Sequence, residues 1–150
     1  MTDEEVEQVS RTLGVVLPRE YRAVLLRPPA DLHDALGLDI AVDGEWITRQ
    51  NLEMRDSPAF FFGREAPWPT EFIIIGEDGN GNAYFIRANE LISPAVYFLD
   101  HEQPDRDDLV SATSISGWLE VVRSNVQKQR RNEEGLRQAI NRKKWWKFWA

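Results

Sequence analysis

The chain of 150 residues contains no cysteine. This absence excludes disulfides, thiolate zinc sites and cysteine nucleophiles, and it fits a reducing compartment. The acidic start, Met1 to Glu5, lacks the basic residues and the apolar run of a signal peptide. No stretch approaches the roughly 18 consecutive apolar residues that a transmembrane helix needs. The sequence therefore predicts a cytoplasmic protein, and its length predicts a single core.

Groups that carry catalysis are scarce. The only histidines are His33 and His101, and no Gly-x-Ser-x-Gly pattern supplies a serine nucleophile. Residues 76–81 are rich in glycine, but they lead from one apolar run into another and carry two acids, which favours a hairpin turn over a phosphate loop. We therefore predict that the protein is not an enzyme and has no cofactor.

One acidic cluster has the residue types of a metal site. Asp100, His101 and Glu102 follow an apolar run, and Asp78 lies in the glycine-rich turn. In a strand, however, the side chains of 100 and 102 point one way and that of 101 points the other. A strand end explains these residues without a ligand, so we predict no metal.

The net charge of −7 conceals a division between the two parts of the chain. Residues 1–122 carry 23 acidic and 9 basic residues, whereas residues 123–150 carry 2 acidic and 9 basic residues. The acidic part is either a plain solvated surface or a surface that attracts a basic protein partner. The same charge argues against nucleic-acid binding by this part.

Hydrophobic periodicity and breaker residues predict an α+β fold with a mostly antiparallel sheet, flanked by N-terminal helices and a long C-terminal helix. Helices are expected at 2–13, from Pro18 to the prolines at 28 and 29, at 31–38, and from Ser114 or Ser116 past Gly135; strands are expected at 72–75, 83–87 and 95–99. Residues 40–47 are read as a strand or hairpin around Asp43-Gly44, and 51–69 as a surface connection with a short buried piece at Phe60–Phe62.

Four stretches, taken in order, resemble the SUKH superfamily, which includes the Smi/Knr family. They are a Leu-Gly-x-x-Leu-Pro-x-x-Tyr segment at 13–22, an apolar strand with a Gly/Asp-rich turn at 72–82, the Val-Tyr-Phe-Leu-Asp-His-Glu run at 96–102, and a helix with an early aromatic at 116–122. Two departures are Arg27-Pro28-Pro29-Ala30, where the family often has Asn-Gly-Gly, and the unmatched segment 30–68.

The resemblance covers roughly residues 3–126 and implies an α+β fold that binds proteins. In bacteria, such proteins resemble antitoxin-type immunity proteins. We therefore expect a SUKH-like domain at 1–126 that neutralises a cognate toxin by direct binding, through Glu77, Asp78, Asn80, Asp100 and Glu102.

The C-terminal end has a distinct chemistry, with four cations and four aromatic residues at 142–149. These side chains would pack on the domain, bind an anionic membrane surface, or contact a protein or a nucleic acid. We expect residues 127–150 to form a basic, tryptophan-rich helical extension. Its predicted contact residues are Lys143, Lys144, Trp145, Trp146, Lys147, Phe148 and Trp149. The alternative function is thus a membrane-peripheral scaffold or adaptor that regulates cell-wall or other surface processes.

Overall fold

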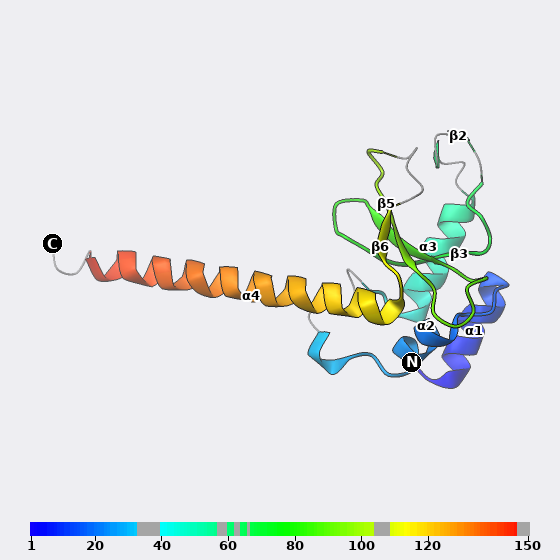
Figure 1. Cartoon of the computed structure of the whole chain (residues 1–150), viewed down its shortest axis with the longest axis horizontal. Coiled ribbons are helices and arrows are strands. Elements are labelled where there is room, and N and C mark those ends of the chain that lie inside the picture. Colours follow the sequence, from blue (N-terminus) through cyan, green and yellow to red (C-terminus); the bar gives the residue numbers. More distant parts are fainter. Residues whose placement is uncertain (33–39, 57–59, 62–63, 66, 104–108, 147–150) are drawn as a thin grey trace.

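A computed structural model describes residues 1–32, 40–56, 60–61, 64–65, 67–103 and 109–146. It confirms the predicted α+β class (Figure 1). The elements are α1 (Asp3–Leu13), α2 (Arg19–Leu26), a 3-10 turn η1 (Ala30–Leu32), α3 (Gly44–Asp56), β1 (Phe60–Phe61), β2 (Arg64–Glu65), β3 (Phe72–Glu77), β4 (Ala83–Arg87), β5 (Val96–Leu99), β6 (Val110–Ala112) and α4 (Ile115–Trp146).

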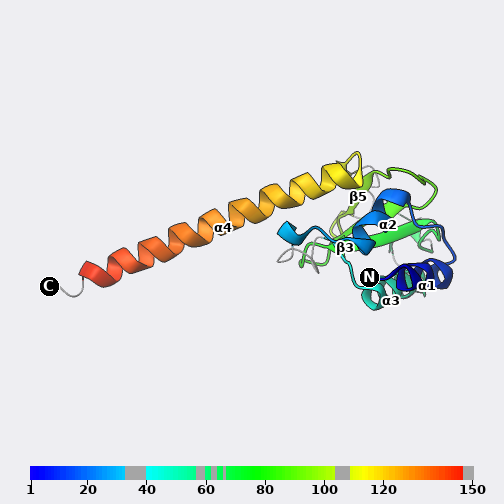
Figure 2. The same ribbon diagram turned by 90° about the horizontal axis from the view of Figure 1, so that it is seen from below.

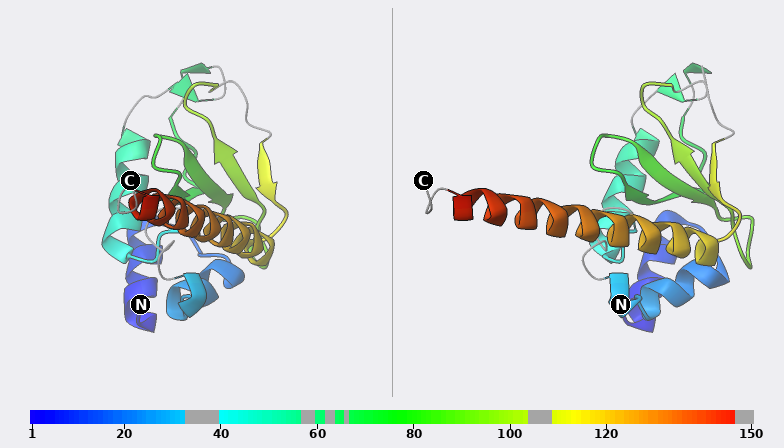
Figure 3. Two further views of the ribbon diagram at one scale, coloured as in Figure 1. Left: turned by 90° about the vertical axis from the view of Figure 1, so that its left-hand side faces the viewer. Right: turned by 60° about the vertical axis from the view of Figure 1, so that its left-hand side comes forward.

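The main sheet is an antiparallel meander in the order β3-β4-β5-β6, and β1 and β2 form a separate two-stranded ladder. Helices α1 and α3 lie side by side, with α2 near them, and α4 leaves the body as a long straight rod (Figures 2 and 3). Strand β6 was not predicted. Of the helix predicted at 31–38, the structure describes only residues 31 and 32, which belong to η1. Residues 33–39 lie outside the described residues.

The first helix begins and ends as the sequence predicts. The Thr2 side chain accepts from the backbone N–H of Glu5, and the Glu5 carboxylate accepts from the backbone of Thr2, which is a capping box. Gly14 adopts the left-handed conformation at φ 65° and ends the helix. Val6, Val9 and Leu13 are buried, so the predicted apolar stripe faces the core.

Helix α3 contradicts the strand or hairpin predicted at 40–47 and the surface connection predicted from 51. Asp43 accepts a hydrogen bond from the backbone N–H of Trp46 at 2.7 Å, so the pair Asp43-Gly44 starts a helix instead of turning a hairpin. Only the beginning of the segment is strand-like, because Ala41 donates to the carbonyl of Ile75 at 2.6 Å. Of the predicted piece Phe60–Phe62, the first two residues form β1, and Phe62 lies outside the described residues.

The sheet is covered on both faces, which explains why residues 72–75 are a continuous apolar run. One face carries Ile73, Ile75 and Ile86 and packs against the helices. The other face is covered by Trp68, whose ring meets those of Phe72 and Phe85 edge to face at centroid distances of 5.5 and 5.3 Å.

Asn51 joins α3 to the edge strand β3 inside the core. Its side chain is fully buried, and its amide group donates to the carbonyls of Ile47 and Ile74 at 2.9 and 3.0 Å. Its amide oxygen accepts from the N–H of Ile74 at 2.8 Å. The side chain thus gives one residue of β3 the two hydrogen bonds that a neighbouring strand would otherwise supply.

Glu20 joins α2 to the start of α4. Its carboxylate accepts from the backbone N–H groups of Ile115 and Ser116 at 3.3 and 2.8 Å, and from the hydroxyl of Ser93 at 2.7 Å. Ser114, the residue before α4, also accepts from the N–H of Gly117 at 3.0 Å. A negative charge at a helix N-terminus is favourable, because unpaired N–H groups and the helix dipole meet there.

Helix α4 has a buried part and an exposed part. Ile115, Trp118, Leu119 and Val122 are buried in the core, and Val126 is partly buried against it. All side chains from 127 to 139 are exposed, and the helix continues past Gly135 without a break, to Trp146. In Figures 1 and 2 this part extends away from the sheet and from α1 and α3.

We predict that Asn51→Ala lowers the free energy of unfolding by about 3 kcal/mol, because the N–H and C=O of Ile74 lose their partner while buried. Urea denaturation measures the change. Asn125→Ala, at an exposed position of α4, is the matched control and should shift stability by less than about 0.5 kcal/mol. Equal stability of the two variants would contradict this role of Asn51.

We predict that Glu20→Gln lowers stability at pH 7 by about 1 kcal/mol, because the start of α4 loses its charged acceptor. Burial by itself raises the pKa of Glu20, but hydrogen bonds from Ser116, Ser93 and Ile115 outweigh it and lower the pKa. Because the pKa of Glu20 is lower in the folded protein, its ionised carboxylate stabilises the fold at pH values above the ordinary glutamate pKa. This stabilisation is lost as the pH falls through the lowered pKa of the folded state. Denaturation at several pH values should therefore show the difference between wild type and variant shrinking below about pH 4; a constant difference would argue against the charge.

Candidate functional site

The turn between β3 and β4 is built around Asp78. Its carboxylate accepts from the backbone N–H groups of Asn80 and Asn82 at 2.8 and 3.2 Å, and from the side-chain amide of Asn82 at 2.8 Å. Gly79 and Gly81 have positive φ angles of 77° and 91°, which explains the glycines without a ligand. Burial alone raises the pKa of Asp78, but the hydrogen bonds from Asn82 and Asn80 overcome it and lower the pKa.

The loop after β5 is held by a second aspartate. Asp100 accepts from the N–H of Glu102 at 2.9 Å and from the side-chain amide of Gln103 at 3.1 Å. Asn82 links the two loops, since its side-chain oxygen accepts from the N–H of His101 at 3.0 Å and lies 2.7 Å from Nδ1 of the same residue.

The five residues predicted as a binding site therefore share one end of the sheet but differ in what they do. Asp78 and Asp100 use their carboxylates to shape the loops. Asn80 and Glu102 are exposed and Glu77 is half-exposed, so these three present side chains to solvent. Among the described residues, no group of three or more His, Asp or Glu is placed to hold a metal ion.

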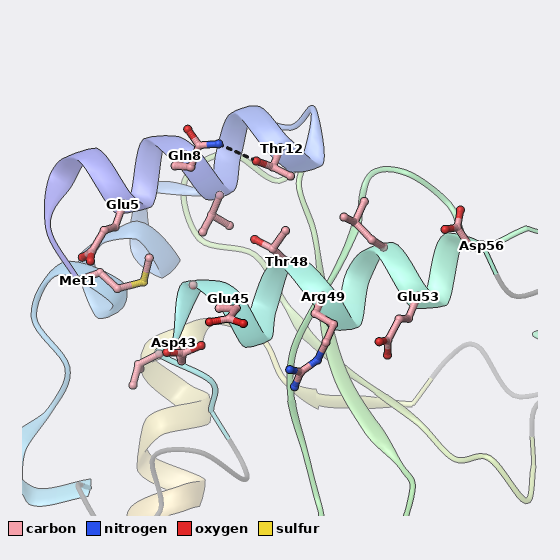
Figure 4. A pocket seen from close by; sticks show the side chains of 14 residues that line it. Met1, Glu5, Gln8, Thr12, Asp43, Glu45, Thr48, Arg49, Glu53 and Asp56 are labelled. Carbon is pink, nitrogen blue, oxygen red and sulfur yellow. Dashed lines mark hydrogen bonds between the residues drawn. The ribbon is translucent and has the colours of Figure 1, made fainter.

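A groove of about 830 Å³ lies between α1 and α3 and was not predicted (Figure 4). Its acidic side chains are Glu5, Asp43, Glu45, Glu53 and Asp56. Arg49 is the one basic side chain among the described residues that line it. Glu45, Arg49, Glu53 and Asp56 follow one another along α3 (Figure 4), at the spacing of one helix face. That spacing can be recognised in the sequence, but it predicts a shared face only if residues 44–56 are helical.

The groove also has an apolar floor. Met1, Val9, Val42 and Leu52 contribute to it, and the side chain of Leu52 is 38% exposed. Helices α1 and α3 approach closely here, because a Cβ added at Gly44 in α3 would lie 3.1 Å from Cγ2 of Val9 in α1. Two of the carboxylates are used locally, since Glu5 accepts from Thr2 and Asp43 from Trp46. Glu45, Glu53 and Asp56 are exposed along the rim.

The charge division of the chain has a structural counterpart. Residues 1–122 include no lysine, and all four lysines of the chain lie beyond them. The exposed part of α4 carries the basic residues away from the acidic body (Figure 1). Of the predicted tail contacts, 143–146 are the last helical residues of α4, and Lys147, Phe148 and Trp149 lie outside the described residues.

The described helices include none that combines the length and the apolar character needed to cross a membrane. Helix α4 is long, but its exposed part contains many charged residues, for example Arg130, Arg131, Glu133 and Glu134.

Comparison with known families decides which family this fold represents. The model of the SMI1 / KNR4 family (SUKH-1) matches residues 1–121. The chain belongs to this family. No curated protein and no solved structure matches it. The match confirms the resemblance drawn from the four sequence stretches, and it ends inside the buried part of α4, so the tail of this SUKH-1 protein lies beyond it. Membership in SUKH-1 is consistent with an immunity role and with binding to a protein partner.

Proposed function

We propose that this SUKH-1 protein is a non-enzymatic immunity protein that neutralises a cognate bacterial toxin by binding it directly. The observation that carries the proposal is the pair of linked loops at one end of the sheet, in a member of a family consistent with this role. The side-chain oxygen of Asn82 accepts a hydrogen bond from the N–H of His101 and so joins the two loops before a partner arrives. An ordered surface loses less conformational entropy on binding.

Charge supports a basic partner. Residues 1–122 carry 23 acidic and 9 basic residues, so the body attracts cationic proteins over a distance set by the salt concentration. Such steering raises association rates and selects for complementary surfaces. A nuclease-like toxin, whose own surface binds phosphate, has the required charge, whereas a nucleic acid is repelled by the body.

Within the loops, we assign two kinds of role. Glu77, Asn80 and Glu102 contact the partner, because they present side chains to solvent at the end of the sheet. Asp78 and Asp100 act by position, because their carboxylates accept hydrogen bonds from the loops themselves. Replacement of Asp78 would thus alter the turn as well as the charge, so it is a poor probe of direct contact.

The test is co-expression with the product of the neighbouring toxin gene. We expect the wild-type chain to restore growth and to co-purify with the toxin, and we expect Glu77→Lys/Glu102→Lys to lose both effects. The matched control is Glu45→Lys/Glu53→Lys in the α1–α3 groove, which changes the net charge equally and should still protect. Absence of a complex and of rescue by the wild type would refute the immunity function.

A second function, a membrane-peripheral scaffold, is supported by the exposed part of α4. This part ends in the residues 142–149, where tryptophans and lysines favour the interface of an anionic membrane. Each basic residue near such a surface adds about 1 kcal/mol of attraction. The exposed helix would hold the acidic body away from lipid of the same charge sign.

Sedimentation with anionic liposomes tests this second function. We expect the full chain to sediment with vesicles containing phosphatidylserine, and a chain that ends at Asn141 to remain in the supernatant. Neutral vesicles are the control and should bind the full chain more weakly, because the electrostatic attraction is lost. Equal binding of the two chains would remove the membrane claim.

A further inference from the structure

The groove between α1 and α3 combines two properties that together suit one kind of ligand. Its floor is apolar, with Val9 and the exposed Leu52, and its rim carries the exposed carboxylates of Glu45, Glu53 and Asp56. A segment with aromatic rings between cations would bury the rings on the floor and pair the cations with the rim. The groove volume of about 830 Å³ is large enough for a few such side chains.

The chain itself contains a segment of this chemistry. Residues 142–149 hold four cations and four aromatic residues and no acid. The acidic residues nearest to them in the chain are Glu133 and Glu134. Three tryptophans and a phenylalanine in so short a segment present much apolar area, which is costly to leave in water.

The path of α4 determines whether the segment can reach the groove of its own chain or only that of a second copy. Val126 packs on the body and the described side chains after it, 127–139, are exposed; the 20 residues from there to Trp146 extend the helix by about 30 Å. This part of α4 points away from α1 and α3 (Figures 2 and 3), so a continuous helix keeps the segment from the groove of its own chain. A second copy has no such restriction.

We propose that the α1–α3 groove binds residues 142–149 of a second copy of this chain. Lysines of the segment pair with Glu45, Glu53 and Asp56, and its aromatic rings lie over Leu52 and Val9. The contact joins two different surfaces, so it is heterologous, and repetition of it produces a closed ring or an open chain of copies. The proposal does not depend on the toxin, because the groove and the linked loops are separate surfaces.

Sedimentation velocity of the full chain over a range of concentrations tests the proposal. We expect concentration-dependent association that weakens as salt increases. The groove pair Glu45→Lys/Glu53→Lys and the tail pair Lys143→Glu/Lys144→Glu should each weaken association about tenfold or more. The chain that carries all four changes should regain much of the affinity, because the charges are exchanged and not lost. The loop pair Glu77→Lys/Glu102→Lys is the control and should associate as the wild type does.

Circular dichroism checks that each variant is folded. If the groove pair fails to fold, Leu52→Ser, which removes apolar area at an exposed position, replaces it and should also weaken association. A wild type that remains monomeric at all concentrations would overturn the proposal, and so would a groove variant that associates like the wild type. If the wild type is monomeric and the tail pair Lys143→Glu/Lys144→Glu weakens only its binding to anionic vesicles, the proposal is overturned and the tail is assigned to the membrane instead. If the groove pair Glu45→Lys/Glu53→Lys no longer associates but still protects against the toxin, self-association and the immunity function are independent of each other.

Discussion

The carboxylate of Glu20 connects three parts of the chain that are distant in sequence. It accepts hydrogen bonds from the first N–H groups of α4 and from Ser93, in the loop between β4 and β5. That loop in turn supplies the carbonyls of Leu91 and Ile92 to the first N–H groups of α2, at 2.8 and 3.2 Å. These bonds fix where α4 begins relative to α2, and the burial of Ile115, Trp118 and Val122 in the core holds its first turns against the body.

Separation of charge is the main functional consequence of this arrangement. A net negative body destabilises itself by repulsion, and basic residues packed on it would relieve that repulsion. The exposed part of α4 instead keeps seven of the 18 basic residues away from the body, so both surfaces remain available to other molecules. The linked loops, the groove and the tail are then three separate surfaces. The proposals for a protein partner and for a second copy of the chain use different ones of these surfaces.

Residues 3–26 and 72–99 were predictable because their signals are local. A capping box, a left-handed glycine and prolines delimit α1 and α2, and a β-branched run before a glycine-rich turn defines β3 and β4. Helix α3 was misread for two reasons. Asp43-Gly44 is as favourable for a helix start as for a hairpin turn. The buried Asn51 interrupts the apolar stripe of α3, and its partner in β3 is 23 residues away. Strand β6 is three residues long, too short for a periodic signal.

The α+β class, the SUKH likeness, the charge division and the residue types at the loops and the tail can all be predicted from the sequence. All of these follow from composition, local periodicity or short motifs. Which of the predicted loop residues face solvent is known only from the three-dimensional structure. The hydrogen bonds of Asp78, Asn82 and Asp100 depend on how each turn closes and on how the two loops meet. The three-dimensional structure also decided that α1 and α3 enclose an acidic groove. Such a groove needs two helices, separate in the chain, to pack side by side, and no local pattern encodes that contact.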